Sequence, residues 1–424
     1  MHHKRNLSLI YAGAFLRSLG IGLLGVVLGI YLFRIGLSSL QIGIVIGAGL
    51  AGAVFGMLLL SFRGDRVGRR KFLFVVCVLS AMAGFSLAFE TRFSILVVLA
   101  FATMLNGMGT DRTAAFASDQ AIVAELVAGQ HRTWALSWYN LVLDIGHALG
   151  ALAAGLPVLL KPWFGNNLFS AYQAIFFAFA AVNLLNGMLY LLLTAEVEIA
   201  KPAVLKEELM RSAGTKRIVS RLAALASLDS FGGGFLTDAL IAYWFFRRFD
   251  VQEQALGMLF FTVHVLNAAS YLGAAWLARR IGLLNTMVFT HLPSSVLLIA
   301  VPFAPNLWIA ILLFLLRELL VEMDVPTRQS YVLALVLPRE RTFASGVTNL
   351  ARNVSWALAS SLSGVVMQFL NFSSPLFLGG AAKIAYDLLL YRNFRKVKPP
   401  EELTSASTPP DVRDFATAGE KTNT

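Results

Sequence analysis

The chain contains very little cysteine and few charged residues. One cysteine, Cys77, is present among 424 residues, which excludes a disulfide within the chain. Charged residues make up 14% of the chain and hydrophobic residues 57%, and the mean hydropathy is +0.69. A water-soluble protein of this length needs far more charge to cover its surface, so the composition indicates a protein whose solvent is the lipid bilayer.

The local patterns that carry most enzyme chemistry are missing as well. No phosphate-binding loop ending in Gly-Lys-Ser/Thr occurs, so we expect no direct use of ATP. No Cys and His cluster has metal-ligand spacing, and no Gly-x-Ser-x-Gly elbow is present. We therefore expect no enzyme activity, no cofactor and no bound metal.

What the chain does have is a series of apolar stretches of roughly 20 residues, the length that crosses a ~30 Å hydrocarbon core as a helix. The predicted spans are residues 7–33, 40–62, 72–89, 95–117, 134–160, 168–193, 218–246, 255–278, 284–303, 307–323, 343–370 and 375–391. The first span is too long for a signal peptide and should persist as a helix. The sequence thus predicts an all-α membrane protein with twelve transmembrane helices.

The net charge of +11 is distributed very unevenly between the predicted loops. On one side of the membrane 24 Lys and Arg residues gather, against five on the other. This asymmetry follows the positive-inside rule and predicts that both termini lie in the cytoplasm, with the protein in the cell membrane. The basic character therefore indicates orientation and contact with membrane lipids, and predicts no nucleic-acid partner.

The two halves of the chain repeat each other. Residues 12–33 match residues 224–245 without gaps at ten of 22 positions, at an offset of 212. Residues 120–155 match 329–364 at twelve of 36 positions, at an offset of 209. Apolar composition alone would not align the shared Ser, Gly and Tyr residues, so we interpret helices one to six and seven to twelve as copies.

Because each copy has six spans, both copies run in the same direction through the membrane. We predict a six-helix half over residues 1–194, a cytoplasmic linker over 195–217 and a second half over 218–393. A proline-containing polar tail over 394–424 is predicted to be disordered. We expect a monomer.

The most specific motif is Gly64-Asp65-Arg66-Val67-Gly68-Arg69-Arg70, between the second and third spans. With it the chain resembles the major facilitator superfamily, whose loop between these helices reads Gly-x-x-x-Asp-Arg-x-Gly-Arg-Arg/Lys. Helix count, equal halves and the position of the motif agree along the whole chain, while Ser61 stands where the family usually has glycine. The alternative is that these charges only enforce topology.

The resemblance implies a cytoplasmic latch that opens during transport. The gate residues expected from the loop and from the paired ends of helices four and ten are Asp65, Arg66, Gly68, Arg69, Arg70, Arg328, Gln329 and Arg341. Pro326 fits the end of helix ten, and Arg328 can extend to the membrane interface.

The fifth span contains Gly146 and Gly150 one turn apart, followed by Gly155. This pattern looks like the antiporter motif of the superfamily, although Ala151 replaces its proline. The fourth span lacks the arginine of proton-coupled drug exporters, and Asn106 lies near that place. Close packing of a neighbouring helix explains the glycines equally well.

Ionisable residues inside spans are costly and often functional. Arg17 and Asp229 occupy equivalent positions of the first repeat with opposite charge, and we expect both at the central cavity. Asp229 could carry a proton or bind a cationic group, with Arg17 tuning its protonation or holding an anion. The alternative is a permanent salt bridge between the halves.

Other ionisable residues are further candidates. Glu318 and Glu322 share a face of helix ten and form a possible acidic site or an ion-pair network, and Asp144 lies in helix five. Asp238 is half a turn out of phase with Asp229, so we expect that both do not face one cavity.

Lys383 and Asp387 should neutralise each other because they are four residues apart. His147 is expected to hydrogen-bond inside the bundle. His264 and His291 are expected to stand alone in packing positions.

The hypothesis is a secondary transporter of a small solute that works by alternating access, with proton-coupled efflux as the favoured form. A facilitative importer of a sugar or metabolite, and a receptor or lipid-handling protein that no longer cycles, are the alternatives.

Overall fold

The computed structural model describes residues 2–111, 114–127, 129–198, 213–334 and 341–395, and almost all of these residues are helical. The helices are α1 His2–Arg34, α2 Ser39–Val67, α3 Arg69–Phe89, α4 Phe93–Thr103, α5 Ala114–Leu126, α6 Gly129–Ala153, α7 Leu156–Leu160, α8 Leu168–Leu191, α9 Ala213–Gly234, α10 Asp238–Phe249, α11 Glu253–Ile281, α12 Leu283–Ala300, α13 Leu307–Val321, α14 Asp324–Ala334, α15 Arg341–Phe369 and α16 Ser374–Phe394. Short 3-10 turns cover Lys161–Phe164, Ala195–Val197 and Val301–Phe303.

Each of the twelve predicted spans contains a helix, but the fourth and tenth were predicted too short, because α5 continues past 117 to 126 and α14 covers 324–334 beyond the predicted end at 323. Eight spans are single helices, and the broken pairs are α4 with α5, α6 with α7, α9 with α10, and α13 with α14. Within the described residues, six helices are long and apolar enough to cross a membrane alone, or seven with α6 and α7 taken together. Residues 396–424 of the predicted tail and most of the predicted linker lie outside the described residues, and α16 extends to Phe394.

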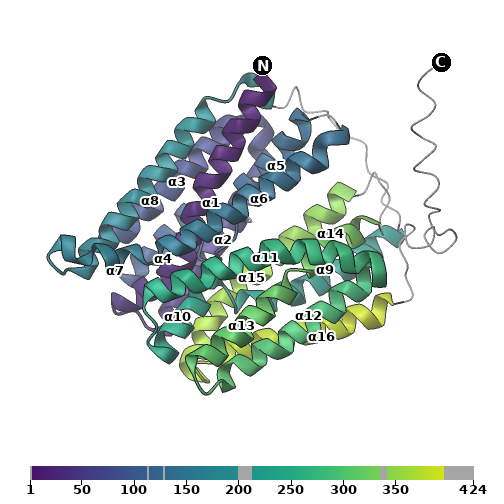
Figure 1. Cartoon of the computed structure of the whole chain (residues 1–424). Helices are drawn as coiled ribbons and strands as arrows, with labels where there is room; N and C mark the ends of the chain where they lie inside the picture. The colour runs from purple at the N-terminus through teal and green to yellow at the C-terminus, as the bar shows by residue number, and fades with distance from the viewer. Residues whose placement is uncertain (1, 112–113, 128, 199–212, 335–340, 396–424) are drawn as a thin grey trace, which may run out of the picture.

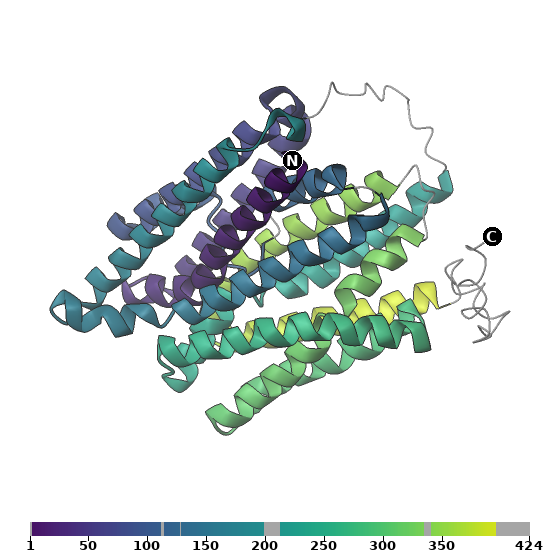
Figure 2. The ribbon, with the colours of Figure 1, turned by 45° about the horizontal axis from the view of Figure 1, so that its top comes forward.

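The spans form two six-helix halves, as predicted (Figure 1). Within each half the first and fifth spans pack closely, α1 against α6 and α9 against α15. Between the halves, α2 packs on α15 and α6 packs on α11. Figure 2 shows the same two bundles from a second direction.

The two ends of the molecule differ in how the halves meet. At the end that holds the short connections near Gly36 and Asp250 (the hairpin end), Arg34 and Glu253 form an ion pair of 2.7 Å between the halves. Ser39 also bonds Tyr243 at 2.9 Å there. Toward the opposite end, which carries the N-terminus (the terminal end), the ribbons of α5 and α6 diverge from those of α9 and α14 (Figure 1).

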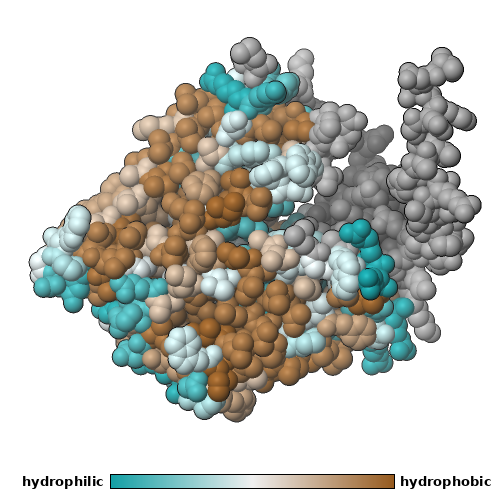
Figure 3. Space-filling model, viewed as in Figure 1, coloured by the Kyte–Doolittle hydropathy of each residue, from teal (hydrophilic) through white to brown (hydrophobic). Residues whose placement is uncertain are grey.

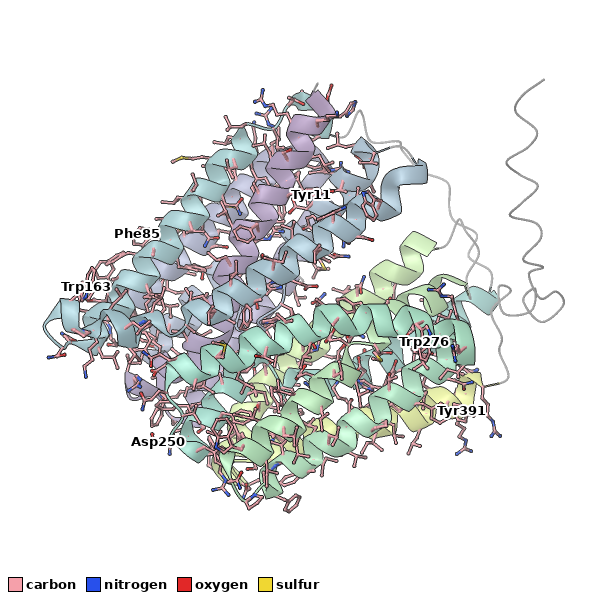
Figure 4. The ribbon with its side chains drawn as sticks, in the orientation of Figure 1. Tyr11, Phe85, Trp163, Asp250, Trp276 and Tyr391 are labelled. Atoms are coloured by element: carbon pink, nitrogen blue, oxygen red, sulfur yellow. The ribbon has the colours of Figure 1, made fainter. Side chains whose placement is uncertain are left out.

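The flanks of the molecule are apolar and the polar residues gather toward its ends (Figure 3). Figure 4 places Trp163 and Asp250 toward the hairpin end, and Trp276 and Tyr391 toward the terminal end. Trp163 is 84% exposed and Trp276 is 53% exposed. Large exposed tryptophans near both ends are typical of the two membrane interfaces, where an amphipathic ring is favoured.

The glycines of the fifth span bring α6 into contact with α1. A Cβ on Gly146 would lie 1.9 Å from Ser18 Oγ, and a Cβ on Gly150 would lie 2.0 Å from the carbonyl oxygen of Leu19. A Cβ on Gly155 would meet Gln254 of the other half at 3.0 Å. The predicted close approach of a neighbouring helix is therefore present at Gly146 and Gly150, and it accounts for both glycines by packing.

Replacing Gly150 by valine should prevent α6 from seating on α1. The clash is with backbone atoms, which cannot rotate away, so a cost of about 3 kcal/mol or more is expected. The measurement is the monodisperse fraction after detergent extraction, followed by a thermal melt. Gly346→Val is the matched control, because nothing lies within 4 Å of the Cβ that would be added there. Equal yields of the two variants would contradict the packing role.

Candidate substrate cavity and its ion-pair clusters

Three broken spans expose backbone in the middle of the bundle. The chain leaves helical structure between α4 and α5, between α9 and α10, and at 322–323 between α13 and α14. The first break is held by Asn106, which accepts from the Met108 amide at 2.8 Å and donates to the Thr110 carbonyl at 3.1 Å. The breaks meet across the halves, because the amide of Ala239 at the start of α10 donates to the Gly107 carbonyl at 3.1 Å.

Broken helices near the bilayer midplane are where transporters of this architecture bind solutes. Here they line a cavity of about 110 Å³ in the C-terminal half. Each helix from α9 to α16 contributes an ionisable side chain to its wall, and Met108 and Thr110 reach it from the N-terminal half. The ionisable lining residues are Asp229, Asp238, His264, His291, Arg317, Glu318, Glu322, Asp324, Arg328, Arg352 and Lys383.

Asp229 is the centre of one cluster in this wall. Its carboxylate accepts from Lys383 Nζ at 3.0 Å and from Arg352 Nη1 at 3.0 Å. Arg328 Nη1 donates to the same carboxylate at 3.2 Å and also bonds Asp324. One buried carboxylate therefore holds three cations from α14, α15 and α16, the arrangement that makes a buried charge tolerable in a membrane.

His291 joins a second carboxylate to this cluster. Its Nδ1 lies 3.0 Å from Asp387, and its Nε2 lies 3.2 Å from Lys383 Nζ. The expectation that His291 stands alone is therefore wrong. The predicted pairing of Lys383 with Asp387 is replaced by these contacts. Lys383 bonds Asp229, and Asp387 bonds His291.

Arg17 is the centre of the matching cluster in the N-terminal half. Its Nε lies 2.5 Å from Asp111 Oδ2, and its Nη2 lies 2.8 Å from Asp119 Oδ2. Tyr190 and Tyr139 donate to Asp119 at 3.0 and 3.2 Å. Two buried carboxylates thus share one guanidinium. Arg17 also lines a separate, smaller cavity of about 30 Å³ together with Asn106 and Asn183.

The two clusters are equivalent with their charges inverted. Arg17 and Asp229 are related by the offset of 212, and Asp119 and Arg328 by the offset of 209. Each half therefore has its own ion pair between its first and fourth spans, Arg17 with Asp119 and Asp229 with Arg328. The alternative of a salt bridge between Arg17 and Asp229 is wrong, because each residue is engaged within its own half.

Sequence reasoning missed Asp119, although a signal was present. Asp119 and Arg328 immediately precede Gln120 and Gln329, the first residues of the second repeat. The same inverted charge that singled out Arg17 and Asp229 occurs there at the same offset. Pairing the two inversions would have placed each ion pair inside one half.

The position of Asp238 also differs from what the sequence predicted. It lines the same cavity as Asp229, although a continuous helix would turn it away. The reason is the break at residues 235–237, after which α10 starts anew with Thr237 as its N-cap residue. His264 Nε2 lies 3.5 Å from Asp238 Oδ2, and the His264 ring is 5.6 Å from that of His147 on α6. His264 therefore does not stand alone.

The remaining candidates divide between the cavity and other places. Glu318 and Glu322 both line the cavity, where Glu318 pairs with Arg317 and Glu322 accepts from the Tyr271 hydroxyl at 3.4 Å. Asp144 is half-buried on α6 and lines neither of the two cavities described above.

Arg328 is directed toward Asp229 in the cavity, so its expected extension to the membrane interface is wrong. The buried carboxylates of Asp229 and Asp324 attract its guanidinium more strongly than the distant interface does.

The connection between α2 and α3, with the start of α3, contacts Glu198 of the linker and the ends of α5 and α8. Gly68 has a φ of +85°, and a Cβ there would lie 3.0 Å from Glu198 Oε2. The Glu198 carboxylate accepts from the backbone amide of Arg69 at 2.6 Å, at the N-terminus of α3. Arg69 also bonds Glu125 on α5, and Arg70 donates to the Leu191 carbonyl at 2.8 Å.

The side chains of the other expected gate residues lie outside the described residues. They are Asp65, Arg66, Gln329 and Arg341.

The sequence model of the family described as Major Facilitator Superfamily matches residues 10–316 and 222–420. The two matches begin 212 residues apart. The uncharacterized membrane protein YJR124C of Saccharomyces cerevisiae (strain ATCC 204508 / S288c) is 27% identical over 419 residues, which cover 91% of this chain and 93% of that protein.

Solved transporters share the fold at low identity. The nucleoside transporter NupG has a TM-score of 0.70 at 16% identity, covering 92% of this chain and 99% of its own. A bacterial homologue of the human lysosomal transporter Spinster, inward-facing and unoccupied, has a TM-score of 0.69 at 15% identity, with coverages of 92% and 95%. A D-xylose–proton symporter has a TM-score of 0.67 at 14% identity, with coverages of 92% and 98%.

Proposed function

This chain belongs to the Major Facilitator Superfamily, and from that premise we propose that it is a secondary transporter that moves a small charged solute by alternating access. The observation that carries the proposal is the cavity between the broken spans α9–α10 and α13–α14, which is lined by ionisable side chains from every helix of one half. Such a wall inside a membrane protein is costly unless a polar solute or ion uses it.

The halves are arranged for rocking about the hairpin end. The Arg34–Glu253 pair and the Ser39–Tyr243 bond connect them there, while their ribbons diverge toward the terminal end. We place the terminal end in the cytoplasm because the excess of Lys and Arg lies on that side. In this orientation the ribbons of the halves diverge toward the cytoplasm, and transport requires the hairpin contacts to separate.

The glycine pattern that resembles the antiporter motif gives no evidence on the direction of transport. Gly146 and Gly150 are accounted for by the contact of α6 with α1, so they carry no preference for efflux. Export and import both proceed through the same cycle, driven by the solute gradient or by protons taken up at the Arg17 cluster. A receptor that does not cycle would keep the hairpin contacts permanently closed.

A disulfide across the hairpin end tests the cycle without knowledge of the solute. An added Cβ on Gly155 would lie 3.4 Å from Gln254 Cβ, close to the ~3.5–4.5 Å of a disulfide, and the two residues belong to different halves. The reporter is Thr237→Cys, a buried lining residue, in a Cys77→Ser background. A membrane-impermeant maleimide is added from the hairpin side, and its attachment to the residue-237 peptide is quantified by mass spectrometry.

We expect the reporter to be labelled in the unlocked protein, and labelling to fall at least about tenfold when Gly155→Cys and Gln254→Cys are oxidised together. Each lock cysteine alone, under the same oxidant, should leave labelling unchanged. A reporter that is never labelled from the hairpin side of the unlocked protein would reject alternating access and favour a receptor that does not cycle.

A further inference from the structure

The cavity wall contains buried polar atoms that are left unsatisfied among the described residues. Within the described part of the chain, four buried oxygen atoms of its lining have no hydrogen-bond partner in the protein: Thr237 Oγ1, Asp238 Oδ2, Asn267 Oδ1 and Asp324 Oδ1. Thr237 is 2% exposed and Asn267 is 9% exposed. Buried acceptors are nearly always satisfied in proteins, so these oxygens call for a ligand that donates hydrogen bonds.

Charge divides the same wall into two parts. On α14 to α16, the cations Arg328, Arg352 and Lys383 are engaged by Asp229, with Asp324 also bound to Arg328. This basic part therefore has no need of an added anion.

On α10 and the end of α13, the carboxylates Asp238, Glu318 and Glu322 face one cation, Arg317, which pairs with Glu318. Asp238 lies 3.5 Å from the imidazole of His264, and Glu322 accepts from the Tyr271 hydroxyl. The three carboxylates of this acidic part therefore share one guanidinium, that of Arg317, among the described lining residues. A cation is the ligand that would compensate them.

The size of the cavity and the spacing of its groups favour an organic cation over a bare metal ion. Among the described residues, no group of three His, Cys, Asp or Glu side chains is close enough to hold a metal. The volume of about 110 Å³ is several times the ~15 Å³ that one water molecule requires. Phe314 and Trp356 add aromatic surface to the lining, which suits an alkylammonium group.

We propose that this acidic part, formed by Asp238, Glu322 and Asn267, is the recognition site for the protonated amine of the transported solute. The proposal rests on the transport function and names the class of its substrate. The amine N–H groups donate to Asp238 Oδ2 and Asn267 Oδ1, and the Glu322 carboxylate compensates the charge. Asp229 and its three cations remain the fixed structural core beside the site.

The test is a binding measurement on the purified full-length protein by isothermal titration calorimetry. The probes are ethanolamine and putrescine, with lactate as the anion, ethylene glycol as the neutral analogue, and sodium chloride alone. We expect the amines to bind and the other probes to give no heat. Glu322→Gln and Asn267→Ala should each weaken amine binding by about tenfold to a hundredfold, the worth of one charge-assisted hydrogen bond. Glu196→Gln, a change at an exposed acid outside the cavity, is the matched control.

Binding of lactate or of sodium in place of the amines would overturn the proposal, and so would amine binding that Glu322→Gln and Asn267→Ala leave intact. Absence of heat with all five probes would also overturn it for small amines. None of these results touches the cross-linking experiment, because the reporter at residue 237 is labelled without any solute. A protein that cycles but binds no amine keeps the transport function and loses this assignment.

Discussion

Replacing Asp229 by asparagine is expected to destabilise the whole protein, more than to abolish transport alone. Asp229 accepts hydrogen bonds from Lys383, Arg352 and Arg328. Asp229, Lys383 and Arg352 are buried, and the Arg328 side chain is 12% exposed. Removing one partner of a buried pair costs about 3–5 kcal/mol, because the other charge is left uncompensated. The change leaves an excess positive charge in the membrane interior.

The measurement is the melting temperature of the detergent-solubilised protein, together with its yield. A loss of this size is a large part of the total stability of a folded protein, so a strongly reduced yield of Asp229→Asn is expected. Asp250→Asn is the matched control. Asp250 is an exposed residue at the hairpin end with a φ of +51°, a conformation that asparagine also adopts.

A second variant separates charge from shape. Adding Lys383→Met to Asp229→Asn removes one cation along with one anion, so the count of charges in the cluster balances again. We expect the double variant to recover much of the lost stability, as neutral replacements of buried ion pairs often do. If Asp229→Asn melts like the parent protein, Asp229 is not the compensating charge of this cluster.

The architecture was predictable from the sequence because it depends on length, apolar content and duplication. The spans and the two copies follow from stretches of roughly 20 apolar residues and from the repeat at offsets near 210. The breaks were not predictable in the same way. Residues 12–33 and 224–245 align without a gap, yet α1 is continuous and its counterpart breaks after Gly234. The local difference is Gly233 and Thr237, where the first copy has Ile21 and Gly25.

The ion pairs show a different limit of sequence reasoning. Inverted charge singled out Arg17 and Asp229, but charge alone cannot say which partner each residue contacts. Partner choice depends on which helices touch. In this fold the first and fourth spans of one half bring Arg17 to Asp119 before any residue of the other half. Asp238 was misplaced for a related reason, since a phase argument holds only along an unbroken helix.

Unlike the change at Asp229, replacing Asp119 by asparagine is expected to leave the protein folded. We expect it to remove the pH dependence of the conformational equilibrium. Asp119 is faced by Arg17 from α1, Asp111 from the first break, Tyr139 from α6 and Tyr190 from α8. Asp119 Oδ2 accepts from Arg17, while the buried Asp119 Oδ1 has no hydrogen-bond partner among the described residues. A proton can bind at this oxygen, which makes Asp119 a better candidate for proton coupling than Asp229.

The readout is the Thr237→Cys reporter, labelled from the hairpin side over a pH series from about 5 to about 8. Each rate is divided by the rate of a free thiol at the same pH, because maleimide reacts with the thiolate. The parent protein should change its labelling rate with pH, because binding of the proton removes a charge that biases one conformation. Asp119→Asn cannot bind a proton at this position, so its normalised labelling rate should be flat across the series while its melting temperature stays near that of the parent. Glu196→Gln should keep the parent profile.

If the pH dependence of reporter labelling is unchanged in Asp119→Asn, the coupling proton binds at another residue. Asp111→Asn then separates the two acids of the cluster, since it leaves the Arg17–Asp119 pair intact. If neither change alters the profile, the N-terminal cluster is a structural counterpart of the Asp229 cluster. The two halves would then differ only in the sign of the charge at their centres, and coupling to protons would have to arise in the acidic part of the cavity itself.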